Sequence, residues 1–266
     1  MNITRSYAVF LRIVYLYRAS PSRWVMILFW AVADLLIWGL LTVYLTRVGG
    51  ATLNFVTVLV GAVVMEHLII RAQTGVSISS MEDVWTRNFI NLFATPLTLG
   101  EYALGLLMSA IATAAISTVF IALLAKILFS YSIIQFGPAI ALYAGTLFLF
   151  GASLGMLGIS MIIRFGPSAE AFVWTLPAAL APFSGVFYPI STLPPAIQWV
   201  SRLIPSTYIF EGMRGVVLGQ NFNGISLAMG IILSLFYFLI GYVLLNRQFM
   251  RALKHGSLTR FLSDTG

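Results

Sequence analysis

The chain has 266 residues, of which 60% are hydrophobic and 9% are charged. Soluble domains carry about 25% charged residues, so this composition excludes a mainly water-exposed surface and indicates a protein that faces lipid. The absence of cysteine excludes disulfides and thiolate chemistry, and two histidines argue against a histidine metal cluster. We assign the net charge of +7 to contact with anionic membrane lipids rather than nucleic acid.

The first 23 residues combine regularly placed arginines with apolar side chains. Arg5, Arg12, Arg18 and Arg23 are spread through this stretch, whereas a signal peptide has a basic start followed by an uninterrupted apolar run. We therefore expect a retained N-terminal segment, 1–23, that forms a helix in the membrane interface with its arginines toward lipid headgroups. A simple cytoplasmic lead-in is the alternative.

Six apolar segments follow, each close to the roughly 20 residues that a helix needs to cross the hydrocarbon core. The predicted spans are 24–46, 53–71, 102–125, 138–163, 170–189 and 226–246. Pro177 and Pro182 interrupt the fifth span, which is tolerated where neighbouring helices satisfy the freed carbonyls. The sequence therefore predicts an all-α integral membrane protein with one transmembrane domain, 1–266.

The basic residues are unevenly divided between the two sides of these spans. Four precede the first span, two lie between the second and third, one lies between the fourth and fifth, and four follow the last span in the tail 247–266. The opposite side holds only Arg47, Lys126, Arg202 and Arg214. Because basic loops stay in the cytoplasm, the pattern predicts that both termini are cytoplasmic.

A patterned stretch in the second cytoplasmic connection predicts a short amphipathic helix over 80–93. Ser80 and Asp83 fit a helix-capping box, and Pro96 ends the pattern. An apolar and aromatic stripe recurs every four residues. The stripe contains Val84, Trp85, Asn88, Phe89, Leu92 and Phe93, and beside it lie Glu82, Thr86, Arg87 and Asn91. Such a helix either lies on the membrane surface or receives a partner protein.

Residues 190–225 on the outer side are neither a clean span nor a polar loop. They contain three prolines and moderately apolar pieces. We expect short helices that dip into the outer leaflet, where irregular backbone must be shielded by protein or by water in a cavity. Elsewhere, Gly151 and Gly155 form a GxxxG match, which we interpret as helix packing within one subunit rather than a dimer seam.

Several sequence motifs resemble the permease subunits of type-2 ATP-binding-cassette exporters, the ABC-2 family. The motifs are Asn91-Leu-Phe-Ala-Thr-Pro-Leu97 with Glu101-Tyr102, Ser184-Gly-Val-Phe-Tyr-Pro189, Leu193-Pro194, and Pro205 through Tyr208 to Glu211-Gly-Met-Arg214. The resemblance covers essentially the whole chain. It implies six spans, a coupling helix between spans two and three, a re-entrant helical hairpin between spans five and six, and residence in a prokaryotic plasma (inner) membrane.

The same resemblance implies that ATP and Mg are bound by a separate ABC-type ATPase subunit, in two copies. Neither of the two lysines, Lys126 and Lys254, precedes Ser or Thr, so a GxxxxGK[ST] phosphate loop is absent. We expect no catalytic residue, cofactor or metal in this chain, and a second permease copy as partner, most simply in a homodimer. The expected ATPase-coupling residues are Glu82, Asp83, Val84, Trp85, Arg87, Phe89, Leu92 and Phe93.

Three ionisable residues fall within predicted spans and are candidates for a transport path. Asp34 lies ten residues after Trp24, about 15 Å into the core, and is either a path residue or a structural, protonated or hydrogen-bonded aspartate. Glu66 and His67 lie about 7 Å inside the cytoplasmic end of the second span. They either line an inner vestibule or pair with a nearby arginine such as Arg71, and pairing is the expectation.

The candidates for an outer gate are Phe187, Tyr188, Pro189, Glu211 and Arg214. Glu211 and Arg214 are three residues apart, so on a helix they share a face and can form an ion pair. We expect this pair to act as a structural staple rather than to contact cargo.

Two other classes of function remain as alternatives. A stand-alone ion-coupled carrier needs ionisable groups within the membrane, for which Asp34 alone is thin support. An enzyme acting on lipid needs clustered acids, histidines or metal ligands, and Glu82-Asp83 is the only adjacent acidic pair. An ATP-driven exporter of a lipid, a glycan or glycolipid, or an amphipathic drug-like molecule is the leading interpretation.

Overall fold

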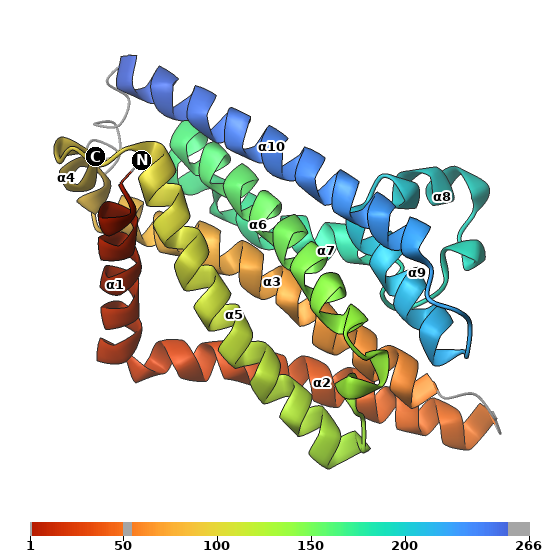
Figure 1. The fold of residues 1–266 in the computed structure, drawn as a ribbon. Helices are drawn as coiled ribbons and strands as arrows, with labels where there is room; N and C mark the ends of the chain where they lie inside the picture. The colour runs from red at the N-terminus through yellow and green to blue at the C-terminus, as the bar shows by residue number, and fades with distance from the viewer. Residues whose placement is uncertain (1, 50–54, 255–266) are drawn as a thin grey trace.

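Figure 1 shows the computed structural model, which describes residues 2–49 and 55–254. Within these ranges the chain forms α-helices, short 3-10 turns and loops, and no strand. The α-helices are α1 (Ile3–Ala19), α2 (Pro21–Gly49), α3 (Phe55–Trp85), α4 (Asn88–Ala94), α5 (Leu99–Phe129), α6 (Ala139–Phe165), α7 (Glu170–Leu180), α8 (Pro195–Arg202), α9 (Pro205–Val217) and α10 (Gly224–Lys254).

Five helices of the described chain are long and apolar enough to cross a membrane: α2, α3, α5, α6 and α10. These five helices overlap the spans predicted over 24–46, 53–71, 102–125, 138–163 and 226–246, of which residues 53 and 54 lie outside the described residues. α3 and α6 form the buried centre of the bundle, whereas the apolar side chains of α2, α5 and α10 are largely exposed. Soluble proteins rarely expose apolar surface on this scale, so this outer surface is suited to contact with lipid.

The predicted fifth span, 170–189, is wrong as a single helix. α7 ends at Leu180 after 11 residues, a 3-10 turn covers Ala181–Phe183, and the chain then opens into a loop. Pro177 cannot donate its backbone hydrogen bond within α7, and Pro182 begins the 3-10 turn. The two prolines therefore explain why the helix is short.

The predicted coupling helix over 80–93 is also wrong as one element. α3 continues without interruption to Trp85, Arg87 takes a left-handed backbone conformation (φ 57°), and α4 begins at Asn88. Ser80 therefore lies buried inside α3 and caps no helix. The last helix is also longer than predicted, because α10 continues into the predicted tail as far as Lys254.

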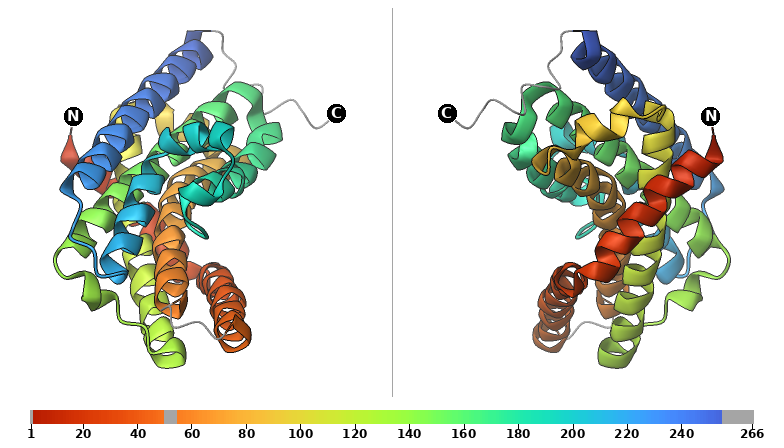
Figure 2. Two further views of the ribbon diagram at one scale, coloured as in Figure 1. Left: turned by 90° about the vertical axis from the view of Figure 1, so that its right-hand side faces the viewer. Right: turned by 90° about the vertical axis from the view of Figure 1, so that its left-hand side faces the viewer.

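The two ends of the bundle carry different short helices (Figures 1 and 2). α1, α4 and the last turns of α10 gather at one end, which we call the α4 end, and α8 and α9 lie at the other, which we call the α8 end. Between α6 and α10 the chain passes from the α4 end to the α8 end through α7, α8 and α9. The expected entry of residues 190–225 into the outer leaflet stays a prediction.

α1 packs against the bundle through a narrow apolar face. Val9 and Ile13 are buried, and a Cβ at Gly105 of α5 would lie 2.6 Å from the Val9 Cβ, so only glycine permits this approach. The start of α5 is fixed by a capping box between Thr98 and Glu101, and Glu101 Oε1 also accepts a hydrogen bond from the Asn2 amide at 2.6 Å.

The arginines of the first 23 residues do not follow the expected orientation toward headgroups. Arg5 donates to the Pro96 carbonyl, and Arg12 and Arg23 form ion pairs with acidic residues near the end of α3. Arg18 is exposed. Arg5 and Arg12 therefore attach α1 to the rest of the protein, and Arg23 attaches the start of α2, because a partly buried guanidinium is stabilised by a nearby carboxylate.

Candidate functional site

Asp83 is the centre of a buried polar network at the α4 end. Its Oδ2 accepts hydrogen bonds from Arg12 Nη2 at 2.6 Å and from the Tyr102 hydroxyl at 2.7 Å, and Arg12 Nη1 bonds Oδ1. The Asp83 and Tyr102 side chains are buried. Burial disfavours the charged form of Arg12, but the hydrogen bond and charge of Asp83 outweigh it and raise the Arg12 pKa above its ordinary value. This network joins α1, α3 and α5.

A second ion pair lies one residue earlier on α3. Arg23 Nη1 bonds both oxygens of Glu82, at 2.6 and 2.7 Å, and the Arg23 guanidinium lies over the Tyr17 ring at 5.8 Å. Glu82 and Asp83 thus hold α3 to the N-terminal helices. Both carboxylates are thus occupied within the chain, and their expected role in ATPase coupling stays a prediction.

Aromatic rings fix α4 against the bundle. Phe89 is only 2% exposed and meets Tyr102 edge to face, and the Phe93 ring lies 4.5 Å from the Phe249 ring of α10. Val84 is buried, and Leu92 is half-buried. The predicted stripe is real, but most of it packs into this protein rather than facing outward.

The residues that do face outward form a small projection between α3 and α4. We call it the α3–α4 tip, and it consists of Trp85, Thr86, Arg87 and Asn91, all exposed. Trp85 is 46% exposed. An exposed aromatic side chain beside a cation and an amide is the composition that protein interfaces favour.

A cavity of about 180 Å³, partly open to the surface, lies between α2, α3 and the loop after α7. Asp34 and Glu66 line it with His67, and the stacked rings of Trp38 and Phe187 (centroids 4.2 Å apart) lie at its wall. The structure thus brings three path candidates from the spans, Asp34, Glu66 and His67, together with the candidate Phe187 from the outer loop. Trp38 was not predicted, although it lies one helical turn after Asp34.

The expected pairing of Glu66 or His67 with an arginine is wrong for the described part of the chain. His67 Nε2 lies 2.6 Å from Ser117 Oγ of α5. Among the described residues, no ion pair includes Glu66 or Asp34. Neither carboxylate has a hydrogen bond to a described residue. Both carboxylates line the cavity, and the choice between a path residue and a structural, protonated or hydrogen-bonded residue for Asp34 stays a prediction.

The predicted ion pair of Glu211 and Arg214 is present on α9. Arg214 Nη1 bonds Glu211 Oε1 at 2.6 Å, and Nη2 donates to the Gly185 carbonyl at 2.7 Å. Glu211 Oε1 also accepts the Ile190 amide at 3.0 Å. Burial lowers the pKa of Arg214, which Glu211 opposes. The pair holds both ends of the loop that contains Phe187, Tyr188 and Pro189.

The other two loop candidates take structural positions. The Tyr188 hydroxyl donates to the Pro182 carbonyl at 2.7 Å, and Pro189 precedes the 3-10 turn Ile190–Thr192. Over residues 2–49 and 55–254, no group of three or more acidic or histidine side chains is placed to hold a metal ion. The candidate site therefore consists of the cavity lined by Asp34 and Glu66, the loop fixed by the Glu211–Arg214 pair, and the exposed α3–α4 tip.

Comparison with known proteins identifies a family model that matches most of the chain. Residues 10–218 match the family model described as ABC-2 type transporter. The chain is 28% identical to Nodulation protein J of Rhizobium meliloti (strain 1021) over 173 residues, which are 62% of this chain and 63% of that protein. It is 30% identical to Nodulation protein J of Rhizobium leguminosarum bv. viciae over 105 residues, 38% of this chain and 39% of that protein.

The chain thus matches less than two thirds of the length of each relative, whereas the family model covers most of the chain and extends from α1 to the last residues of α9. The long apolar helices agree with a multi-pass membrane protein. This chain belongs to the ABC-2 type transporter family of membrane permeases.

Proposed function

We propose that this chain is the membrane-spanning permease of an ATP-driven exporter, which works with two copies of a separate ABC-type ATPase and a second permease copy. In this proposal the α4 end is cytoplasmic, in a prokaryotic plasma membrane, and the ATPase supplies ATP and Mg. Cargo is a lipid, a glycan or glycolipid, or an amphipathic drug-like molecule that moves outward past the loop at Phe187.

The observation that carries the proposal is the continuity of α3. Its 31 residues rise about 45 Å, which exceeds the roughly 30 Å hydrocarbon core. One stretch of this helix lines the cavity with Glu66, and its end presents Trp85 at the α3–α4 tip. A displacement of the tip therefore reaches the cavity along a single hydrogen-bonded helix with no intervening loop.

The connections around the tip suit this role. Asp83 ties the end of α3 to α1 and α5, so a force on Trp85 moves three helices together. ATP-driven closure of two ATPase subunits against two such tips supplies the force that switches a transporter between inward- and outward-open states.

The contacts of the outer loop support a role in closing the proposed path. Phe187 stacks on Trp38 at the cavity wall, and the Glu211–Arg214 pair fixes the loop that carries Phe187. Because Trp38 lies on α2 and Phe187 on the loop, a movement of α2 away from the loop would separate the two stacked rings and open the cavity toward the α8 end.

The chain contains no cysteine, so single-cysteine variants give a direct test. Thr86→Cys places a thiol at the tip, and Ala196→Cys places a matched exposed thiol on α8. In native membranes, a short bifunctional cross-linker is expected to join Thr86→Cys, and not Ala196→Cys, to a co-purifying protein with a phosphate-binding loop and ATPase activity. Mass spectrometry identifies the partner.

The same variants test the orientation. A membrane-impermeant thiol reagent added outside intact cells is expected to label Ala196→Cys and to spare Thr86→Cys. Cross-linking at α8 instead of the tip, or purification of the chain alone with transport intact in vesicles that lack ATP, refutes the proposal.

A further inference from the structure

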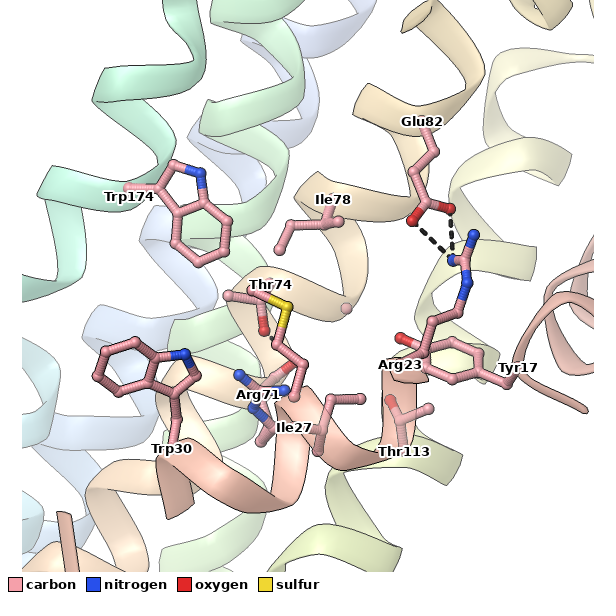
Figure 3. Close-up of a pocket in the computed structure, with 12 residues that line it drawn as sticks. Tyr17, Arg23, Ile27, Trp30, Arg71, Thr74, Ile78, Glu82, Thr113 and Trp174 are labelled. Carbon is pink, nitrogen blue, oxygen red and sulfur yellow. Dashed lines mark hydrogen bonds and ion pairs between the residues drawn. The ribbon is translucent and has the colours of Figure 1, made fainter. Parts of the chain in front are cut away.

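A second pocket, of about 110 Å³, opens between α1, α2, α3, α5 and α7 near the α4 end (Figure 3). Two indole rings, Trp30 and Trp174, lie on one side, and the Arg23–Glu82 ion pair lies on the other. Arg71 lies between them. The transport path through Asp34 and Glu66 does not use these residues, although Ile70 of that cavity is the neighbour of Arg71 on α3.

The charges of this pocket do not balance within the described chain. Glu82 is the only acidic residue among those that line the pocket, and both of its oxygens bond Arg23. Arg71 has no ion pair with a described residue, and its Nε is buried without a hydrogen-bond partner there. The carboxylate expected to neutralise it, Glu66, faces the other cavity.

A partly buried guanidinium without an anion is costly, because it has lost water without gaining a partner. Five N–H donors in a planar fork match the oxygens of a phosphate group, and arginine is the residue that proteins use for such recognition. The hydroxyls of Thr74 and Thr113 already donate to backbone carbonyls, so they remain available only as acceptors. Arg71 is therefore the charged donor of the lining that has no anion among the described residues, beside the neutral N–H groups of Trp30 and Trp174.

The surroundings indicate an amphipathic ligand. Met26 and Trp30 are more than half exposed, at 57% and 56%, and Trp174 is 45% exposed. Tryptophan rings in such positions favour the boundary between headgroups and acyl chains. The pocket therefore offers one cation at its base and an apolar, aromatic rim.

We propose that this pocket binds the phosphate group of an amphipathic molecule at the membrane interface, with Arg71 as its ion partner and the rim of Met26, Trp30 and Trp174 against its apolar chain. The phosphate belongs to a membrane lipid or to a phosphorylated lipid-linked cargo. The assignment concerns binding alone and does not depend on the proposed transport activity.

The test uses the purified full chain in an uncharged maltoside detergent. Binding of dioctanoyl phosphatidate is followed by tryptophan fluorescence and by the shift in melting temperature. Dioctanoylglycerol has the same chains without the phosphate, and glycerol 3-phosphate has the phosphate without the chains. We expect saturable binding of the phosphatidate only, and at least about tenfold weaker binding by Arg71→Gln.

Two variants serve as controls. Arg71→Lys keeps the charge without the planar fork, so its affinity is expected to fall between those of the wild type and Arg71→Gln. Arg164→Gln removes an exposed charge of the same sign outside the pocket, and its affinity is expected to be unchanged.

Equal affinity of Arg71→Gln and the wild type for the phosphatidate overturns the proposal, as does equally tight binding of dioctanoylglycerol. Glycerol 3-phosphate binding as tightly as the phosphatidate would assign the site to soluble phosphate esters instead. Should Arg71→Gln not fold, the three ligands on the wild type still decide between these outcomes. Mass spectrometry of lipids retained by the wild type distinguishes membrane lipid from lipid-linked cargo.

Discussion

The hydroxyl of Tyr102 donates a hydrogen bond to Asp83 Oδ2 at 2.7 Å, and both side chains are buried. This bond joins the first turn of α5 to the last turn of α3. Arg12 bonds the same carboxylate from α1, so one acidic residue holds three helices at the α4 end. Removal of the carboxylate leaves the buried Tyr102 hydroxyl and the half-buried Arg12 guanidinium without this partner, whereas removal of the hydroxyl leaves the ion pair intact.

Asp83→Asn is expected to destabilise the fold by about 2 kcal/mol, because Arg12, whose side chain is 26% exposed, loses its anion. Tyr102→Phe is expected to cost about 1 kcal/mol, the usual loss for one buried hydrogen bond. Melting temperatures in detergent rank the two variants. A larger loss for Tyr102→Phe than for Asp83→Asn contradicts the assignment of Asp83 as the centre of the network.

Trp85→Ala and Phe89→Ala are expected to act in different ways, although the two residues are four apart on the predicted stripe. Phe89 is 2% exposed among aromatic rings, so truncation is expected to cost about 3 kcal/mol of stability. Trp85 is 46% exposed, so its truncation is expected to leave the melting temperature nearly unchanged.

The functional readout is the ATPase activity of the complex. We expect Trp85→Ala to lower transport and cargo-stimulated ATPase activity with the chain inserted and folded. Unchanged coupling in Trp85→Ala, measured beside Thr192→Ala as an exposed control at the α8 end, counts against the tip as the receiving surface.

The long apolar runs made five spans predictable, because about 20 apolar residues have few stable alternatives to a helix in lipid. The continuation of α3 was not predictable from composition. Residues 72–85 contain several Ser and Thr residues, and contacts with other helices support their helical conformation: Ser77 Oγ donates to the Gly155 carbonyl of α6 at 3.1 Å, and Gln73 Nε2 donates to the Val173 carbonyl of α7 at 3.0 Å. Tertiary contacts of this kind override local propensity.

The candidate site was predictable in part. The pattern at Val84–Phe93 identified an amphipathic stretch, but the chain breaks at Arg87, which is neither glycine nor proline, so the break gave no signal. The cost of a charge in lipid identified Asp34 and Glu66 as unusual. Their meeting in one cavity depends on how α2 and α3 rotate against each other, which a single sequence does not contain.

Gly155→Ala is expected to destabilise the contact between α3 and α6 by about 1–3 kcal/mol through overpacking. A Cβ at this position would lie 2.7 Å from the Val76 Cβ and 3.0 Å from the Gln73 carbonyl oxygen. This contact also confirms that the GxxxG match packs within one subunit. Thermal unfolding in detergent measures the loss.

Gly145→Ala provides the matched control on the same helix, because a Cβ there meets nothing within 4 Å. It is expected to be neutral or to stabilise α6 by up to about 1 kcal/mol, since alanine favours a helix over glycine. Equal effects of the two substitutions exclude close packing as the reason for glycine at position 155.

Arg214→Gln is expected to release the loop between Gly185 and Ile190. The guanidinium bonds both Glu211 and the Gly185 carbonyl, and Glu211 in turn holds the Ile190 amide. Loss of these charge-assisted bonds is expected to speed amide hydrogen exchange in this loop about tenfold or more.

The control is Arg202→Gln, because Arg202 is exposed on α8 and its guanidinium lies over the Trp199 ring, outside the loop contacts. Mass spectrometry of peptic peptides reports exchange over the loop in each variant. If Arg214→Gln leaves the loop as protected as Arg202→Gln does, the ion pair is not what holds it.

Asp34 and Glu66 distinguish an ATP-driven exporter from an ion-coupled carrier, since two acidic residues facing one cavity are the feature that a carrier requires. In sealed vesicles that contain ATP and the partner ATPase, we expect a protonophore to leave transport unchanged. Asp34→Asn and Glu66→Gln are then expected to alter the affinity for cargo, because the carboxylates line the cavity.

Sensitivity of transport to the protonophore would instead indicate an ion-coupled carrier. Transport that stops with the protonophore at constant ATP makes the ion gradient the energy source. Loss of that sensitivity in Asp34→Asn or Glu66→Gln would then identify the coupling group. An ATP-driven exporter has its energy delivered at the α3–α4 tip, so Trp85→Ala lowers its transport rate whereas the two cavity variants change mainly its cargo affinity. An ion-coupled carrier reverses this division, because neutralising a carboxylate removes the binding site for the driving ion.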